Sequence, residues 1–196
     1  MLTNATIADL WRPREKTHAC LYDISLILGG SLLLGLSAQI GVGWPVPFTM
    51  QTFAVLMIGA LFGARRGSLT VVAYLIEGAA GLPVFSLGRG GLPVLFGPTG
   101  GYLFGFIAAA YVTGLLAQNR WDRRILTTIA AMMIGNLLIL SFGLLWLTLI
   151  VGFKNALMTG IYPFIAGDLI KIGLAAALLP TGWKLLGRFG PVGYRK

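Results

Sequence analysis

The stretch GPTGGYLFGFIAAAYVTGLL, residues 97–116, joins turn-forming residues directly to a long apolar run. Its glycines and proline predict a loop, and the uncharged run that follows has the composition of a membrane-spanning helix. The whole chain shares this composition, since 57% of its 196 residues are hydrophobic and only 11% are charged. These proportions predict an integral membrane protein with one domain, residues 1–196, and little room for a soluble part.

Hydrophobic runs bounded by charges or by glycine and proline divide the chain into six candidate spans. They cover residues 22–42, 48–64, 67–82, 99–118, 125–151 and 157–181. The second and third are short for a full crossing, so either their Gly/Pro-rich neighbours dip into the protein, which favours a cavity, or the helices lie off-centre in the bilayer. We therefore expect an all-α membrane protein, a six-transmembrane-helix bundle with an N-terminal segment at 1–21 and a tail at 182–196.

The basic residues predict the orientation. Twelve of the 15 Lys and Arg residues fall in the N-terminal segment, in the tail, and in the links that follow spans two and four. Because cytoplasmic loops carry the excess of Lys and Arg, we expect both termini in the cytoplasm. The net charge of +9 then reflects topology and does not indicate a nucleic-acid partner.

Three ionisable residues, Glu77, Asp168 and Lys171, fall inside predicted spans, where charge is costly and marks a candidate functional site. Asp168 and Lys171 are three residues apart, so they share one helix face and can neutralise one another while both point into one cavity. The alternative is an ion pair that only holds the bundle together. Glu77 lies near a span end, where its side chain can also simply reach water.

Further candidates fall on the same, outer side. Arg89 lies in the long Gly/Pro-rich link, Gly100 and Gly101 open span four, and Gln51 opens span two. Backbone N–H groups at a helix N-terminus favour an anionic or amide-bearing ligand, and Arg89 can contact a carboxylate. The pattern predicts a ligand pocket at the extracytoplasmic side, closed below, with Tyr102 among its aromatic walls. Turns and close helix packing are the alternative explanation for the glycines.

Several positions have a second explanation. Asn136 in span five is either a pocket donor or a hydrogen-bonding link between helices. Ser31 and Gly35 in span one form a small-residue patch for another helix, either from a partner or from the same bundle. Asp23 has the residue type and position of an N-cap for span one.

The chain offers little for catalysis. The sequence contains no HExxH, GxSxG or paired Cys/His metal spacing, and it has a single histidine. It also lacks a GxxxxGK[ST] phosphate loop, so energy for concentrating a ligand must come from a partner or an ion gradient. We expect a binding subunit rather than an enzyme, with no catalytic residue, metal or cofactor.

Four blocks of sequence carry a family resemblance. They read PVPFTMQTFAVLMIGALFG (45–63), GAAGLPVF followed by GRGG (78–91), GPTGGYLFGF (97–106) and GDLIKIGLA (167–175). These blocks resemble the signature stretches of the BioY family, the biotin-binding S components of energy-coupling factor (ECF) transporters. The similarity runs through spans two to six and covers most of the chain.

The resemblance implies a cell-membrane subunit that captures biotin from outside and delivers it with a T component and two ATPase subunits. It places Asp168 and Lys171 at the ureido ring and Arg89 at the valerate carboxylate, or the Lys and Arg with exchanged roles. Ser31 and Gly35 are the nearest match to the family's T-component docking motif. The alternatives are a solitary or proton-coupled transporter that uses Glu77 and Asp168 as proton sites, and a membrane enzyme that uses them as acid and base.

Overall fold

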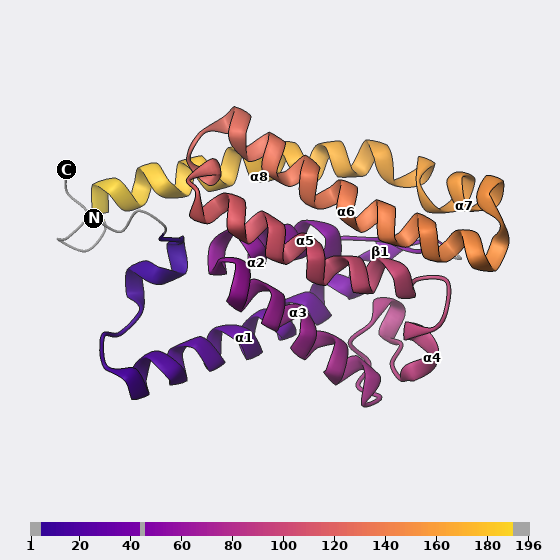
Figure 1. Ribbon diagram of the computed structural model, residues 1–196, viewed down its shortest axis with the longest axis horizontal. Helices are drawn as coiled ribbons and strands as arrows, with labels where there is room; N and C mark the ends of the chain where they lie inside the picture. The colour runs from indigo at the N-terminus through magenta and orange to yellow at the C-terminus, as the bar shows by residue number, and fades with distance from the viewer. Residues whose placement is uncertain (1–4, 44–45, 190–196) are drawn as a thin grey trace.

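The computed structural model describes residues 5–43 and 46–189, and nearly all of its regular structure is helical (Figure 1). The longer helices are α1 (Lys16–Gln39), α2 (Gln51–Phe62), α3 (Ala64–Ala79), α5 (Gly100–Gln118), α6 (Ile125–Val151) and α8 (Tyr162–Phe189). The shorter helical segments are η1 (Ile7–Trp11), η2 (Ser86–Gly88), α4 (Leu92–Leu95), η3 (Trp121–Arg123) and α7 (Phe153–Gly160). The predicted helical fold is confirmed.

Four helical stretches are long and apolar enough to cross a membrane: α1, α5, α6 and Phe153–Gly187. The α2 helix has 12 residues and α3 has 16, so both fall short of the roughly 20 residues of a full span, as their sequences predict. The end of the predicted tail, with Arg195 and Lys196, lies outside the described residues.

The link after α1 departs from the all-helical expectation. Strand β1 (Gly41–Val42) pairs antiparallel with β2 (Phe48–Thr49), with Gly41 opposite Thr49 and Val42 opposite Phe48. The N–H of Met50 donates to the carbonyl oxygen of Ile40 at 3.0 Å and continues the pairing up to α2. This short hairpin fixes Phe48 and Thr49 at the entrance to α2.

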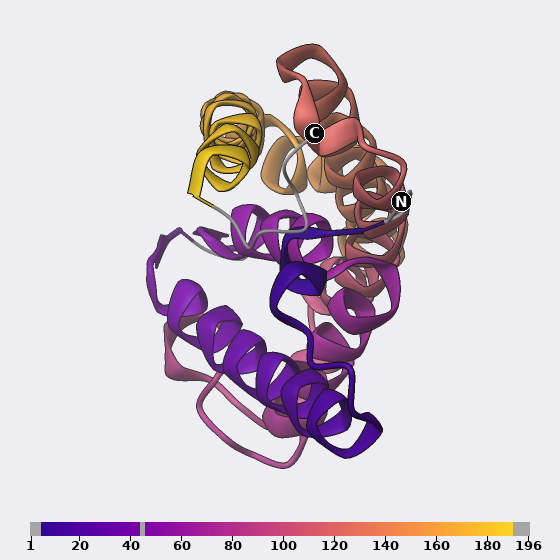
Figure 2. The same ribbon diagram turned by 90° about the vertical axis from the view of Figure 1, so that its left-hand side faces the viewer.

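The links divide between two ends of the molecule (Figure 1). Strand β1, α4 and α7 lie at one end, whereas η1 and the C-terminal end of α8 lie at the other. In the middle, α5 packs against α2, α3 and α6. Seen from the η1 end in Figure 2, α1 and α8 lie on opposite sides of this central group. The links that the sequence predicts to be extracytoplasmic therefore share one end.

The α1 helix begins earlier than its apolar run predicts. Its first residue is Lys16 and its N-cap is Glu15, so Asp23 lies inside the helix. The Asp23 carboxylate accepts from Arg12 Nη2 at 2.8 Å and from Arg66 Nη1 at 3.3 Å. The N-cap prediction for Asp23 is wrong, because these polar contacts stabilise helical turns beyond the apolar part.

The small residues of α1 face the bundle. Ser31 is 1% exposed and its hydroxyl donates to Glu77 Oε1 at 2.7 Å, while a Cβ on Gly35 would lie 3.3 Å from Val84 Cβ. The structure thus gives Ser31 and Gly35 the role within the bundle that the sequence left as an alternative, and docking of a partner helix at these residues stays a prediction. The outer surface of α1 carries large apolar side chains instead: Leu21, Ile24, Leu28, Leu32, Leu33 and Leu36.

A buried carboxylate ties α8 to the link between α5 and α6. Asp122 is 1% exposed, and the indole N–H of Trp183 donates to its Oδ2. The Arg123 guanidinium lies 4.2 Å from the centroid of the Trp183 ring. Burial raises the pKa of Asp122 to about 6, although the Trp183 hydrogen bond and the charge of Arg123 act in the opposite direction. The sequence gives no sign of this contact, because no spacing links positions 122 and 183.

We expect Asp122→Asn to change how stability depends on pH. The ordinary pKa of this carboxyl is 3.8 and its pKa in the folded protein is about 6. The folded protein therefore keeps the proton to a higher pH than the unfolded chain does, and its free energy of unfolding falls as the pH rises between these two values. Asparagine keeps an acceptor for Trp183 without the charge. The variant should exceed the parent in stability by about 1–3 kcal/mol at pH 7.5 and match it near pH 4. Thermal unfolding in detergent at the two pH values measures the difference in stability between variant and parent. An equal difference at both pH values contradicts a titrating Asp122.

Candidate ligand-binding site

An ion pair lies buried on α8. Asp168 and Lys171 are one turn apart, with Lys171 Nζ 3.3 Å from Asp168 Oδ1, and they are 3% and 6% exposed. The pairing predicted from their spacing is confirmed. Removing two charges from water is costly, so such a pair needs further hydrogen bonds to be stable.

Neighbouring elements supply these hydrogen bonds. Asn136 Nδ2 on α6 donates to Asp168 Oδ2 at 3.0 Å. Lys171 Nζ donates to Thr52 Oγ1 on α2 at 2.8 Å and to the carbonyl oxygen of Thr49 at 2.7 Å. We call these five residues, Thr49, Thr52, Asn136, Asp168 and Lys171, the polar cluster. It presents a carboxylate acceptor beside ammonium and amide donors, a combination that suits a ligand with both donors and acceptors.

An aromatic ring covers the ammonium group of the polar cluster. Lys171 Nζ lies 4.0 Å from the centroid of the Phe48 ring, within the range of a cation–π interaction. The β1–β2 hairpin positions Phe48, and its ring lies against Gly167 of α8, where any side chain would overlap it. The Phe164 ring centroid lies 5.8 Å from that of Phe48 and extends the aromatic surface along α8.

Two cavities meet at the polar cluster. The larger measures about 490 Å³ and the smaller about 210 Å³, each including the open space at its mouth. Thr52 lines both, and Lys171 contacts Thr49 and Thr52 in the wall of the larger one. Asn136, Asp168 and Lys171 line the smaller cavity. The walls of the larger cavity are mainly apolar, with Phe85, Tyr102, Leu103, Phe106, Ile139, Leu140 and Phe164 among them.

Gln51 and Tyr102 line the larger cavity, but their polar atoms serve the protein itself. The Tyr102 hydroxyl donates to the carbonyl oxygen of Gly160 at 2.8 Å. Gln51 Nε2 donates to the Tyr74 hydroxyl at 2.7 Å, and Tyr74 donates to the carbonyl oxygen of Val84 at 3.1 Å. These two predicted site residues therefore build the cavity wall. Tyr74, which sequence reasoning missed, anchors the loop after α3.

The Gly/Pro-rich loop between α3 and α5 borders the larger cavity through Phe85 and Ser86. Arg89 lies in the same loop and donates two hydrogen bonds to Ser86, from Nε to the carbonyl oxygen at 3.1 Å and from Nη2 to Oγ at 3.2 Å. Gln39 of α1 holds it as well, since its amide donates to the carbonyl oxygen of Phe85 at 3.2 Å and accepts from the N–H of Gly88 at 2.8 Å. Arg89 thus contacts a lining residue and is not itself among the residues that line the cavity.

Gly100 and Gly101 are not among the residues that line the two cavities. A Cβ on Gly100 would overlap the carbonyl oxygen of Leu95, and one on Gly101 would overlap Trp146 and lie 2.5 Å from the carbonyl oxygen of Phe142. The structure thus gives both glycines the close-packing role that the sequence left as an alternative.

We expect Gly101→Ala to lower stability by about 1–3 kcal/mol, because the added methyl group must displace Trp146 or move α5 away from α6. Trp146 also donates to the carbonyl oxygen of Gly97 at 3.0 Å, so its displacement disturbs the loop before α5. The matched control is Gly173→Ala on α8, where a Cβ meets nothing within 4 Å. Equal melting temperatures for the two variants argue against the packing role of Gly101.

The predicted site residues thus separate into three groups. The structure brings Asn136, Asp168 and Lys171 together, and it places Gln51 and Tyr102 in the wall of the adjoining cavity. The third group lines neither cavity: it consists of Glu77, which is hydrogen-bonded to Ser31, and of Arg89, Gly100 and Gly101. Within residues 5–43 and 46–189, no three His, Cys, Asp or Glu side chains gather closely enough to hold a metal ion.

Residues 11–188 match the model of the BioY family. The biotin transporter BioY of Rhizobium etli is 42% identical over 171 residues, which cover 82% of this chain and 87% of that relative. The biotin transporter BioY of Thermotoga maritima is 40% identical over 166 residues, which cover 84% of this chain and 93% of that relative. The crystal structure of the S-component for biotin from an ECF-type ABC transporter matches with a TM-score of 0.73 at 23% identity, over 87% of this chain and 95% of that chain, and so shares the fold.

Proposed function

Because the chain belongs to the BioY family, we propose that it is the membrane-embedded subunit that binds biotin for an ATP-driven importer of the ECF type. The observation that carries this proposal is the polar cluster, which lies at the edge of a mainly apolar cavity of about 490 Å³. Curated relatives named as biotin transporters support the choice of ligand.

The chemistry of biotin fits this arrangement. Biotin combines a cyclic urea, an apolar sulfur-containing ring and a chain that ends in a carboxylate. In the proposed pose, a ureido N–H donates to Asp168 and the ureido oxygen accepts from Lys171 or Asn136. The sulfur-containing ring packs among the aromatic walls. Lys171 then exchanges its internal bond to Thr52 for a bond to the ligand.

In this pose the carboxylate points toward the loop that carries Ser86 and Arg89. A side-chain rotation that breaks the two Arg89 contacts to Ser86 brings the guanidinium to the carboxylate. The reverse pose uses the same residues, with the carboxylate at Lys171 and the ureido ring under the loop.

Arg89→Gln distinguishes the two poses. In the first pose the variant loses a charge-assisted contact, so it should bind biotin roughly 10-fold more weakly than the parent does. The variant and the parent should bind biotin methyl ester with similar affinity, because this ligand has no carboxylate. Competition binding with both ligands measures this. If Arg89→Gln weakens both ligands equally, or neither, Arg89 does not bind the carboxylate.

We further propose that the chain crosses the membrane six times with both termini in the cytoplasm and the larger cavity open to the outside. The distribution of Lys and Arg supports this orientation, as does the position of β1 and α4 at the end away from η1 (Figure 1). Since the sequence has no phosphate loop, ATP hydrolysis is assigned to two partner subunits, coupled through a transmembrane T component.

Isothermal titration of biotin into the purified chain tests the function directly. We expect saturable heat with one site per chain, and much weaker heat from lipoate, which has a carboxylate chain but no ureido ring. No saturable heat with biotin at micromolar concentrations refutes the proposal. The proton-coupled alternative gains no support from Glu77, which accepts a hydrogen bond from Ser31 and is not among the residues that line either cavity.

A further inference from the structure

A wide groove lies at the η1 end of the molecule, between the N-terminal segment, the first half of α1 and the start of α3. It measures about 1260 Å³ including its open mouth. Five cationic side chains and two acidic ones line it, an excess of three positive charges. The cations are Arg12, Arg14, Lys16, Arg65 and Arg66, and the acids are Asp9 and Asp23.

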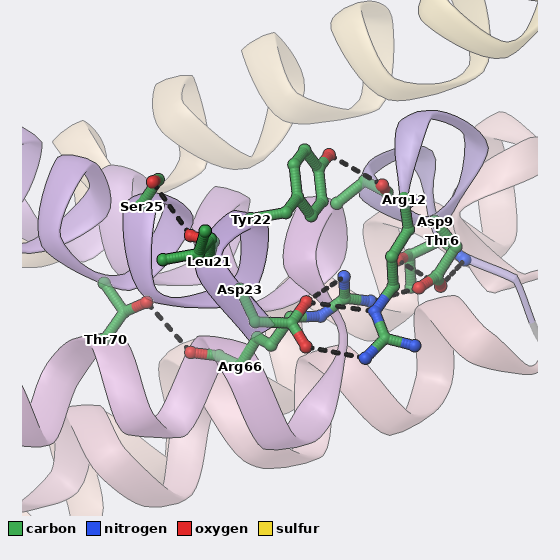
Figure 3. Close-up of polar contacts among 10 residues, drawn as sticks. Thr6, Asp9, Arg12, Leu21, Tyr22, Asp23, Ser25, Arg66 and Thr70 are labelled. Atoms are coloured by element: carbon green, nitrogen blue, oxygen red, sulfur yellow. Dashed lines mark hydrogen bonds and ion pairs between the residues drawn. The ribbon is translucent and has the colours of Figure 1, made fainter. Parts of the chain in front are cut away.

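Both acids form ion pairs with arginines of the same groove (Figure 3). Arg66 pairs with Asp9 and also with Asp23, where Nη1 lies 3.3 Å from Oδ1. Arg12 pairs with the other oxygen of Asp23 at 2.8 Å. These four side chains form one connected network that joins η1, α1 and α3. The network fixes the shape of the groove without cancelling its positive charge.

The remaining cations of the groove are exposed. In the ranges 5–43 and 46–189, Arg14, Lys16 and Arg65 form no ion pair with a carboxylate. Guanidinium groups bind phosphate oxygens through two parallel hydrogen bonds, and an ammonium group adds a point charge. The rim of the groove therefore suits a phosphodiester.

One side of the groove is apolar. Ile24, Ile27, Phe62 and Leu69 line it, and Ile24 and Leu69 are 47% and 43% exposed at the outer surface. In a membrane protein that surface faces acyl chains. An apolar surface does not stabilise a free anion, whereas a phospholipid can place its phosphate at the cationic rim and an acyl chain along the apolar side chains.

We propose that this groove binds the headgroup of an anionic phospholipid from the cytoplasmic leaflet. The distribution of Lys and Arg places the groove on that side, where acidic lipids attract basic segments near the membrane. The bound lipid fastens the N-terminal segment against α3. This inference does not depend on biotin binding, because no residue of the polar cluster lines the groove.

Native mass spectrometry of the full chain tests the proposal with phosphatidylglycerol and phosphatidylcholine. We expect the parent to retain phosphatidylglycerol at least about 10-fold more strongly, and Arg14→Gln/Arg65→Gln to lose this preference, since each cation near the surface contributes to the attraction. The matched control is Arg120→Gln/Arg124→Gln, which removes two exposed arginines on the same predicted side but outside the groove. The control should keep the preference.

Thermal unfolding separates lipid binding from misfolding. In phosphatidylcholine the groove variant should have the same melting temperature as the parent. It should lack only the increase in melting temperature that phosphatidylglycerol gives the parent. An equal preference in the groove variant and the control overturns the proposal. It is also overturned if inorganic phosphate stabilises the parent as much as phosphatidylglycerol does, or if the groove variant keeps its lipid preference but no longer co-purifies with coupling subunits.

Discussion

Lys171→Met is expected to lower the free energy of unfolding by about 3–5 kcal/mol, because it leaves the buried Asp168 carboxylate without its cation. Methionine keeps much of the apolar volume of the lysine stem, so a new cavity contributes little to the loss. The affinity for biotin should fall by at least about 30-fold in the same preparation, since truncating one partner of a buried, hydrogen-bonded pair costs roughly 2–5 kcal/mol in binding. Thermal unfolding and titration calorimetry measure the two effects.

The double variant Asp168→Asn/Lys171→Met separates charge balance from ligand binding. Both residues are then neutral, and neutral replacement of a whole buried pair is often tolerated, so most of the lost stability should return. Biotin binding should remain as weak as in Lys171→Met. A double variant as unstable as the single one contradicts the unpaired charge as the cause, and restored biotin binding contradicts a ligand role for the pair.

Asp168→Asn is expected to weaken biotin binding by about 10- to 100-fold. A hydrogen bond from a ureido N–H to a charged acceptor contributes roughly 1.5–3 kcal/mol, and asparagine replaces it with a neutral acceptor. The shape of the side chain is kept, and Asn136 on α6 retains an oxygen to which it can donate. Titration calorimetry with biotin measures the change.

The matched control for Asp168→Asn is Glu77→Gln, which also removes one carboxylate inside the bundle. Glu77 is hydrogen-bonded to Ser31 and lines neither cavity, so its loss should change biotin affinity by less than about threefold. If the two variants weaken biotin equally, the charge of the bundle as a whole, or a shared proton site, explains the result better than a contact between Asp168 and biotin.

Local patterns in the sequence were sufficient for the helical membrane class and for the buried ion pair. The pairing of Asp168 and Lys171 follows from three-residue spacing in an apolar helix, because helix geometry alone brings such residues together. The contact from Asn136 to Asp168 joins positions 32 apart on different helices. Helix packing decides such contacts, which is why the sequence left two roles open for Asn136.

Glycine and other small residues were the main source of ambiguity. A glycine that exposes backbone to a ligand and one that admits a neighbouring side chain both require a missing Cβ, and only the position of Trp146 assigns Gly101 to the second kind. The patch at Ser31 had the same ambiguity. The hydrogen bond from Ser31 to Glu77 shows that this patch faces the bundle, and the residue types alone do not predict which way it faces.

The structure of the chain with biotin bound tests the central claim most directly. We expect one biotin in the larger cavity, with its ureido group or its carboxylate within hydrogen-bond distance of the polar cluster and the Lys171 bond to Thr52 exchanged for a ligand contact. Biotin bound elsewhere, with the Asp168–Lys171 pair and its bonds to Asn136 and Thr52 unchanged, would contradict it.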